Sequence, residues 1–112
     1  MINIEKVNDV LIVSLATDNK LNATISQKFK AEVAKLFEEP GLKMVIDLGS
    51  VEYIDSSGFG ALLSVLRVSK SSFAQLKFCN IAPDVMELVH LLQLQTVFDI
   101  RDNIDECLNS FN

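Results

Sequence analysis

A turn with chemically distinctive side chains stands in the middle of the chain, at Asp55-Ser56-Ser57-Gly58-Phe59-Gly60. One carboxylate and two hydroxyls follow an apolar run and precede a second apolar run with helical spacing. Each of these side chains is a good N-cap, because a short side-chain oxygen accepts a hydrogen bond from a free N–H of the first helical turn. One cap suffices for a helix, so three candidate caps in a row are more than capping needs. Gly58 and Gly60 also need a reason, because glycine inside a helix costs about 1 kcal/mol relative to alanine. The pattern therefore predicts a strand-to-helix corner where another molecule approaches a helix N-terminus, which favours anions.

The chain lacks the groups that would make these serines nucleophiles. A serine hydrolase needs a base beside its nucleophile, and the single histidine, His90, lies among apolar neighbours of a predicted helix. No G-x-S-x-G elbow and no G-x-x-x-x-G-K-S/T phosphate loop occur, and Leu63 stands where a G-x-G-x-x-G motif needs its third glycine. The acidic pairs Glu38-Glu39 and Asp105-Glu106 have no second carboxylate set to face them. We therefore expect a binding module with no catalytic activity and no cofactor.

Composition and charge narrow the class of protein. With 112 residues, 49% of them hydrophobic, the chain is expected to form a single domain over residues 1–112. A net charge of −5 argues against binding to nucleic acid or to an anionic membrane surface. No apolar run approaches the roughly 20 residues of a membrane-spanning helix, and no signal peptide is recognisable, so a cytoplasmic location is expected. Cys79 and Cys107 lack metal-ligand or disulfide spacing and are expected to be small core residues.

The elements before the turn follow from the spacing of apolar residues. Apolar alternation from Ile2 to Val7 predicts an edge strand, and Asn8-Asp9 a tight turn into a buried strand over Val10 to Leu15. The polar stretch from Ala16 to Asn22 is expected to be a loop. A helix follows that Asn22 or Thr24 caps and Pro40-Gly41 ends. Its inner face is expected to carry Ile25, Phe29, Val33, Leu36 and Phe37. The continuous apolar run Met44-Val45-Ile46 is typical of a strand covered on both faces.

The elements after the turn alternate between helices and strands. We expect a second helix directly after the turn, followed by a strand near Leu76 to Cys79 and a third helix that begins at Pro83. A strand at Val97 to Ile100 and a final helix that begins with Asp102 and Asp105 should complete the chain. The expected inward residues of the three helices are Phe59, Leu62, Leu63, Val65 and Leu66, then Val85, Leu88, Val89 and Leu92, then Ile104, Leu108 and Phe111. This alternation predicts an α/β fold with a mostly parallel mixed sheet of about five strands and about four helices, the first strand being antiparallel.

The segment from Met44 to Leu63 resembles the centre of a STAS domain, in particular that of a bacterial anti-sigma factor antagonist. The resemblance rests on three features: an apolar strand that ends in Asp-Leu, the Asp-Ser-Ser-Gly turn, and the following Gly-Phe-Gly-x-Leu-Leu. The order of elements also fits over nearly the whole chain. In that family a serine kinase, which is itself an anti-sigma factor, phosphorylates the first serine of the turn. The matching residue here is Ser56.

The resemblance implies a switch in which charge controls binding. The unphosphorylated protein would bind the kinase and free a sigma factor, the phosphorylated protein would dissociate, and a phosphatase could reset the switch. A phosphate adds about −1.5 to −2 charges, which a partner packed on Asp55, Ser57, Gly58 and Phe59 would have to desolvate. Phe59 has two interpretations, a core residue of the first helical turn or an exposed contact.

The loop before the first helix departs from the family pattern. Family members usually have Gly-x-Leu-Asp there, whereas this chain has Lys20-Leu21-Asn22, so that Asn22 takes the place of the aspartate and the glycine is absent. Asn22 is therefore expected to cap the helix and to contact the partner without the charge. A second hypothesis remains, in which the chain is a stand-alone STAS subunit of a transporter or larger signalling complex and Ser56 has a structural role.

Overall fold

A five-stranded mixed sheet organises the computed structural model, which describes residues 1–111. The strands run in the order β1-β2-β4-β6-β7, with β1 antiparallel to β2 and every other pair parallel. Their bounds are β1 Ile2–Val7, β2 Val10–Leu15, β4 Lys43–Asp47, β6 Gln75–Cys79 and β7 Ile100–Arg101. The predicted α/β class, the mostly parallel sheet and the antiparallel first strand are confirmed.

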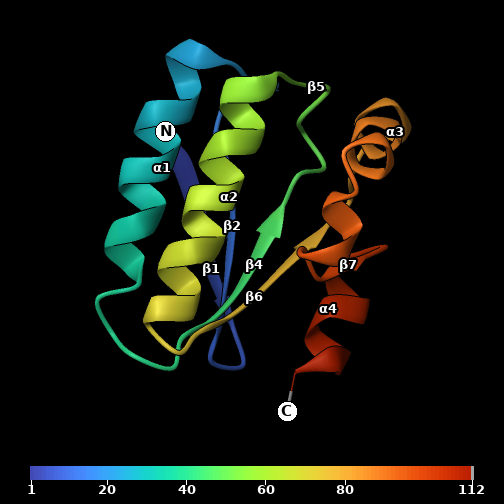
Figure 1. The fold of residues 1–112 in the computed structure, drawn as a ribbon. Coiled ribbons are helices and arrows are strands. Elements are labelled where there is room, and N and C mark those ends of the chain that lie inside the picture. Colours follow the sequence, from blue (N-terminus) through green and yellow to red (C-terminus); the bar gives the residue numbers. More distant parts are fainter. Residues whose placement is uncertain (112) are drawn as a thin grey trace.

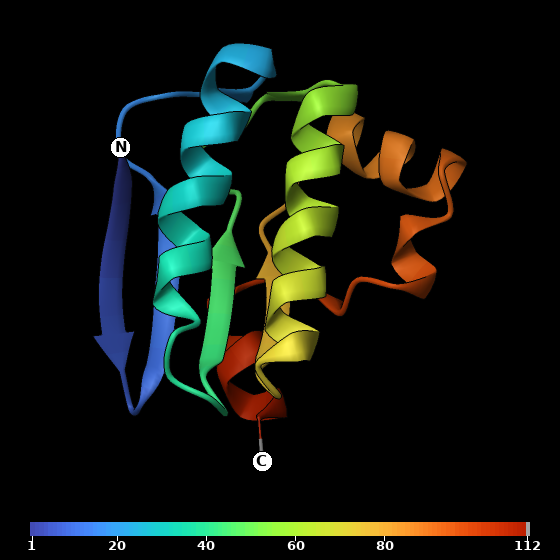
Figure 2. The ribbon, with the colours of Figure 1, turned by 60° about the vertical axis from the view of Figure 1, so that its left-hand side comes forward.

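Helices cover both faces of this sheet (Figures 1 and 2). The helices are α1 Ala23–Leu36, α2 Ser56–Ser71, α3 Pro83–Leu91 and α4 Ile104–Ser110, with a short 3-10 helix η1 at Leu94–Thr96. The long helices α1 and α2 lie side by side on one face, and both begin at the same end of the sheet, as Figure 2 shows. Helix α4 covers the opposite face. The start of α2 therefore lies at the carboxyl-terminal edge of the parallel strands, where open α/β sheets place their binding sites.

The central strand β4 is buried on both sides, as its sequence predicted. Met44 and Ile46 face the larger core beneath α1 and α2, whereas Val45 faces the smaller core beneath α4, and all three side chains are fully buried. Cys79 and Cys107 meet in the smaller core, where both are buried and free. Burial raises the pKa of each thiol and keeps it neutral. The prediction that the cysteines are core residues is confirmed.

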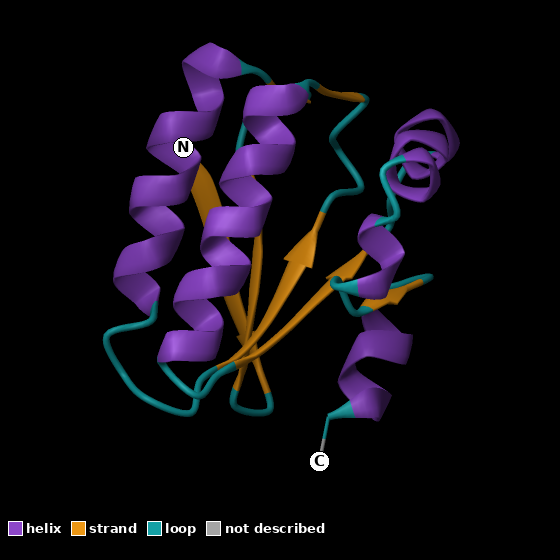
Figure 3. Cartoon of the chain, in the orientation of Figure 1, coloured by secondary structure: helices purple, strands orange, loops and turns teal. Residues whose placement is uncertain are grey.

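A second, two-stranded sheet corrects the expectation that residues 16–22 form only a loop. Strand β3, Lys20–Leu21, pairs in parallel with β5, Tyr53–Ile54, and Figure 3 shows that β5 leads directly into α2. The strand at the corner is therefore β5 and not the main-sheet strand β4, which ends at Asp47. Two-residue strands have no periodicity to detect, and this pair forms through contact between segments distant in the chain.

The carboxyl-terminal third contains the other corrections. Residues 97–100 do not form the expected strand, because Phe98 turns inward to pack on Phe78, with ring centroids 4.6 Å apart, and β7 begins only at Ile100. Helix α3 buries Val85 and Val89, but Leu88 and Leu92 are 39% and 54% exposed, so its inner stripe is narrower than predicted. Asn103, and not Asp102, caps the final helix, since its side chain accepts a hydrogen bond from the N–H of Glu106.

Candidate functional site

The corner between β5 and α2 forms as a strand-to-helix turn with Asp55 as its N-cap. The backbone of Asp55 is extended, with φ −96° and ψ −173°, and its Oδ1 accepts a hydrogen bond from the Gly58 N–H at 3.0 Å. The Asp55 carbonyl oxygen accepts the first helical hydrogen bond, from the Phe59 N–H at 3.0 Å. The short acceptor side chain predicted for this position therefore caps the helix as expected.

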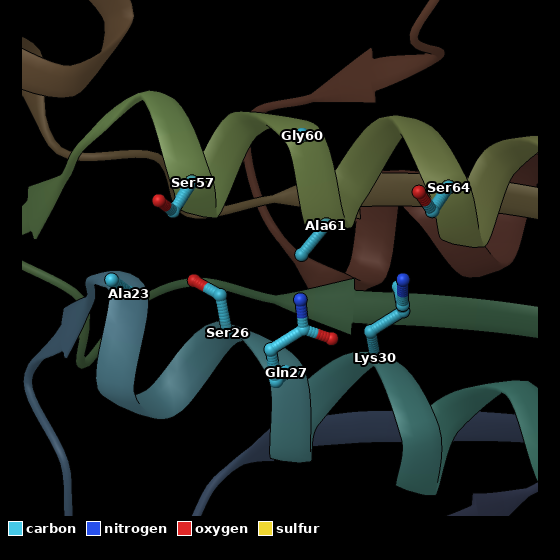
Figure 4. Close-up of a pocket in the computed structure, with 8 residues that line it drawn as sticks. All are labelled: Ala23, Ser26, Gln27, Lys30, Ser57, Gly60, Ala61 and Ser64. Atoms are coloured by element: carbon cyan, nitrogen blue, oxygen red, sulfur yellow. The ribbon is translucent and has the colours of Figure 1, made fainter.

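Ser56 and Ser57 are the first two residues of α2, and both side chains are exposed. Ser57 points toward α1 across a groove between the two helices (Figure 4). The α2 N-terminus carries positive partial charge from its unpaired N–H groups, and no acidic residue lies in its first turn. An exposed hydroxyl in this position can accept a phosphoryl group from an external enzyme, and the local field partly offsets the added charge.

The structure corrects the expectation that a partner packs directly on Gly58 and Phe59. Phe59 is only 6% exposed and belongs to the main core, which is the first of its two interpretations. Gly58 is buried, and a Cβ placed there would overlap the carbonyl oxygen of Leu21 and lie 2.6 Å from Ile54 Cγ2. The close approach that requires this glycine is therefore made by β3 of the same chain. Gly60 differs, because a Cβ there would meet open space.

Asn22 caps α1 and lies next to the corner. Its Oδ1 accepts hydrogen bonds from the N–H groups of Thr24, at 3.1 Å, and Ile25, at 3.2 Å. Strand β3 pairs with β5 so that Leu21 faces Ile54, and each is followed by the N-cap of a helix. The structure thereby brings Asn22 and the Asp55-Ser56 corner to one edge of the domain, and the contact of these residues with a partner stays a prediction.

Two features beside the corner were missed from sequence. Asp47 Oδ1 accepts hydrogen bonds from the Gly49 N–H, at 2.9 Å, and from Asn80 Nδ2, at 3.0 Å, which ties the end of β4 to the end of β6. Tyr53 on β5 is 54% exposed, immediately before the corner. The available signal for Tyr53 was an aromatic residue two positions before the Asp55 turn, whereas the Asp47–Asn80 contact joins residues distant in the chain.

The described residues place no catalytic constellation at this corner. His90 is exposed on α3, and within residues 1–111 no three His, Cys, Asp or Glu side chains are arranged to hold a metal ion. The clearest charged network lies elsewhere, where Lys77 and Arg101 both contact Asp99. None of the helices that the structure describes is long and apolar enough to cross a membrane.

The fold and the corner define a small α/β domain with an exposed serine at the start of its second helix. The model of the STAS domain family matches residues 1–107, and the chain belongs to this family. The resemblance seen in the sequence, and the fold class that it implied, are both confirmed.

Three relatives illustrate the similarity. BtrV of Bordetella bronchiseptica, named as a candidate anti-sigma factor antagonist, is 23% identical over 110 residues, which span 98% of this chain and 93% of BtrV. A candidate anti-sigma factor antagonist from Thermotoga maritima, solved by crystallography, is 25% identical with a TM-score of 0.82 and covers 96% of this chain and 92% of its own. SpoIIAA of Bacillus, solved in its phosphorylated form, has a TM-score of 0.70 at 14% identity, covers 97% of each chain and shows the shared fold alone.

Proposed function

We propose that this chain is a phosphorylation-controlled anti-sigma factor antagonist, and that Ser56 is the residue that a serine kinase phosphorylates. The observation that carries the proposal is the exposed hydroxyl of Ser56 on the first residue of α2, directly after the N-cap Asp55. Relatives named as anti-sigma factor antagonists align over nearly the whole chain, and a protein of the same fold, SpoIIAA, has been solved in a phosphorylated form.

Phosphoryl transfer to Ser56 needs little from this chain. Catalysis of such a transfer consists mostly of positioning and of electrostatic stabilisation by the kinase, its metal ions and ATP. The chain contributes an accessible acceptor held on a rigid helix start, where a kinase active site can enclose it. We therefore describe the protein as a substrate and binding protein, with no catalytic residue and no cofactor of its own.

The added phosphate acts on binding more than on folding. It brings about −1.5 to −2 charges to a position where the α2 N-terminus offsets part of the charge and Asp55 repels it. Because Ser56 is exposed, the phosphate stays in water and the core beneath it is unchanged. A partner docked over the corner would have to remove that water from a dianion, which is unfavourable unless cations pair with it. Phosphorylation therefore releases the partner.

The proposed contact surface surrounds Ser56. Asn22, Asp55 and Ser57 lie at the edge from which α1 and α2 begin, and Tyr53 adds an exposed aromatic side chain of the kind that often anchors an interface. Gly58 and Phe59 contribute from beneath, because they set how closely α2 packs on β3 and on the core. Asn22 preserves the helix cap without the carboxylate that family members usually carry there.

In this scheme the unphosphorylated protein binds a kinase that is also an anti-sigma factor, and that kinase releases its sigma factor. The phosphorylated protein dissociates, and a phosphatase restores it. Residues 1–112 act as a single STAS domain in the cytoplasm, without binding nucleic acid or inserting into a membrane. The charge of −5 and the fold are consistent with such a protein-binding role.

The site is tested by incubating the protein with its cognate serine kinase and magnesium ATP, followed by peptide mapping with mass spectrometry. We expect one phosphate on Ser56 of the parent protein, none on a Ser56→Ala variant, and a phosphate still on Ser56 of a Ser57→Ala variant, which is the control for the position of the modification. Phosphate on Ser57, or undiminished modification of the Ser56→Ala variant, would show that the site is assigned wrongly.

A further inference from the structure

A groove separates the amino-terminal halves of α1 and α2, next to the corner but distinct from Ser56. Its volume is about 340 Å³, which lies within the usual range of small-molecule sites. Figure 4 shows side chains of both helices directed into it. The polar residues that line it are Ser26, Gln27 and Lys30 of α1 and Ser57 and Ser64 of α2.

The hydroxyl of Ser26 is the anomalous group in this groove. Ser26 is 3% exposed, and its Oγ has no hydrogen-bond partner among residues 1–111. In Figure 4 this oxygen points across the groove toward α2 and Ser57. A buried hydroxyl without a partner destabilises a folded protein, and buried polar groups are nearly always hydrogen-bonded. The side chain is therefore placed as the donor or acceptor for something that enters the groove.

The charge of the lining indicates which kind of ligand enters. The chain has 15 acidic residues, yet the groove is lined by no carboxylate and by one ammonium group, that of Lys30. Helices α1 and α2 both begin at this end, and neither has an acidic residue in its first turn. Ala23 and Ser57, from the first turns of α1 and α2, line the groove together with one lysine and several neutral donors, so the positive ends of both helices lie close to it. This set suits an oxyanion, and it contains no carboxylate that would balance the charge of a cation.

We propose that this groove binds a phosphate group, as inorganic phosphate or as a small phosphate monoester, through Lys30 and the hydroxyls of Ser26 and Ser57. The net charge of −5 opposes the approach of any anion, so binding depends on this local set of donors. Gln27 and Lys30 have long side chains that rotate to admit the ligand to Ser26. The site requires neither a kinase nor a modified Ser56, and it therefore stands or falls independently of the proposed switch.

The binding test is a titration of the purified protein with inorganic phosphate, followed by ¹⁵N NMR at constant ionic strength with chloride as the balancing anion. We expect saturable shifts of the Ser26, Ser57 and Gly60 amide signals. Ser26→Ala and Lys30→Gln should each weaken binding by about tenfold or more, as expected for loss of a hydrogen bond to a charged group. Lys28→Gln is the matched control, because Lys28 is an exposed lysine of the same helix outside the groove. Glycerol phosphate in a parallel titration distinguishes a monoester ligand from free phosphate.

Thermal stability gives a second readout. The Ser26→Ala variant should melt at a higher temperature than the parent protein in phosphate-free buffer, since an unpaired buried hydroxyl has been removed. It should also lose the rise in melting temperature that phosphate gives to the parent protein. Shifts that never saturate, or phosphate binding that is equal in the parent protein and in the Ser26→Ala and Lys30→Gln variants, would overturn the proposal.

Discussion

The backbone N–H of Asp55 donates a hydrogen bond to the carbonyl oxygen of Leu21, with 3.2 Å between the two atoms. This contact joins the N-cap of α2 to the strand that leads into α1. Together with the pairing of Leu21 and Ile54, it holds the starts of the two helices at one edge of the domain. The position of Ser56 therefore depends on β3 as much as on the residues around it.

The close contact of α2 with β3 predicts opposite effects for substitution of two neighbouring glycines. Gly58→Ala places a methyl group against the Leu21 carbonyl and Ile54, and we expect it to destabilise the protein by about 1–3 kcal/mol or more. Gly60→Ala adds a methyl group in open space within the helix and should stabilise by about 0.5–1 kcal/mol. Urea denaturation of both variants measures the difference. Equal effects of the two substitutions would contradict the described contact.

The N-caps Asn22 and Asp55 should each contribute to the stability of the fold, whatever role they have in partner binding. Asn22→Ala and Asp55→Ala should each reduce stability by about 1 kcal/mol, because each leaves helical N–H groups without an acceptor. Asn22→Asp keeps the acceptor and adds a charge that the helix dipole favours, so stability should be retained or slightly increased. Thermal denaturation at low salt checks both expectations. Destabilisation by Asn22→Asp as large as that by Asn22→Ala would show that the amide nitrogen, and not the oxygen, is important here.

The ion pair between Lys77 of β6 and Asp99 should stabilise the fold at a place far from the corner. Lys77 Nζ lies 2.6 Å from Asp99 Oδ2, and the lysine side chain is only 8% exposed. Asp99→Asn leaves this ammonium group buried without its carboxylate. A fully buried pair would lose several kcal/mol, but Asp99 is 38% exposed, so we expect a loss of about 1–3 kcal/mol. Asp102→Asn, at an exposed neighbouring aspartate, is the control and should change stability by less than about 0.5 kcal/mol.

The same network predicts part of the acid sensitivity of the fold. Burial opposes charge on Asp99, but hydrogen bonds from Arg101 and Lys77 outweigh it and lower the pKa of the carboxyl group below its ordinary value. The unfolded chain therefore takes up this proton first as the pH falls. The stabilisation is complete above the unfolded pKa of about 3.9 and is lost as the pH falls through the lower folded pKa. The free energy of unfolding should be measured for the parent protein and the Asp99→Asn variant at pH 7 and at acidic pH. We expect it to fall less for the variant than for the parent protein as the pH is lowered.

Local chemistry and non-local contacts account for what could and could not be predicted from the sequence. The cap at Asp55, a cap for α1 at Asn22 or Thr24 and the doubly buried β4 follow from short-range patterns. The structure contains the first and the last, and it selects Asn22 as the cap of α1. The pairing of β3 with β5 could not be predicted, because neither segment is long enough to show a period. The sequence pattern at Gly58 therefore indicates an approach by another molecule, whereas Leu21 of the same chain makes the close contact. Leu88 and Leu92 fit a helical stripe, but Val85 and Val89 are the buried residues of α3, and both leucines are exposed.

The most direct test of the switch compares the affinity of the cognate kinase for the unmodified protein and for the protein phosphorylated on Ser56, by titration calorimetry. We expect phosphorylation to weaken binding by about tenfold or more, which corresponds to about 1.4 kcal/mol, while the ¹⁵N spectrum retains the dispersion of a folded protein. A Ser71→Ala variant, altered at an exposed serine at the opposite end of α2, should bind as the unmodified protein does. Equal affinities of the two forms, with the phosphate verified on Ser56, would contradict the switch and favour a permanent STAS subunit of a larger assembly.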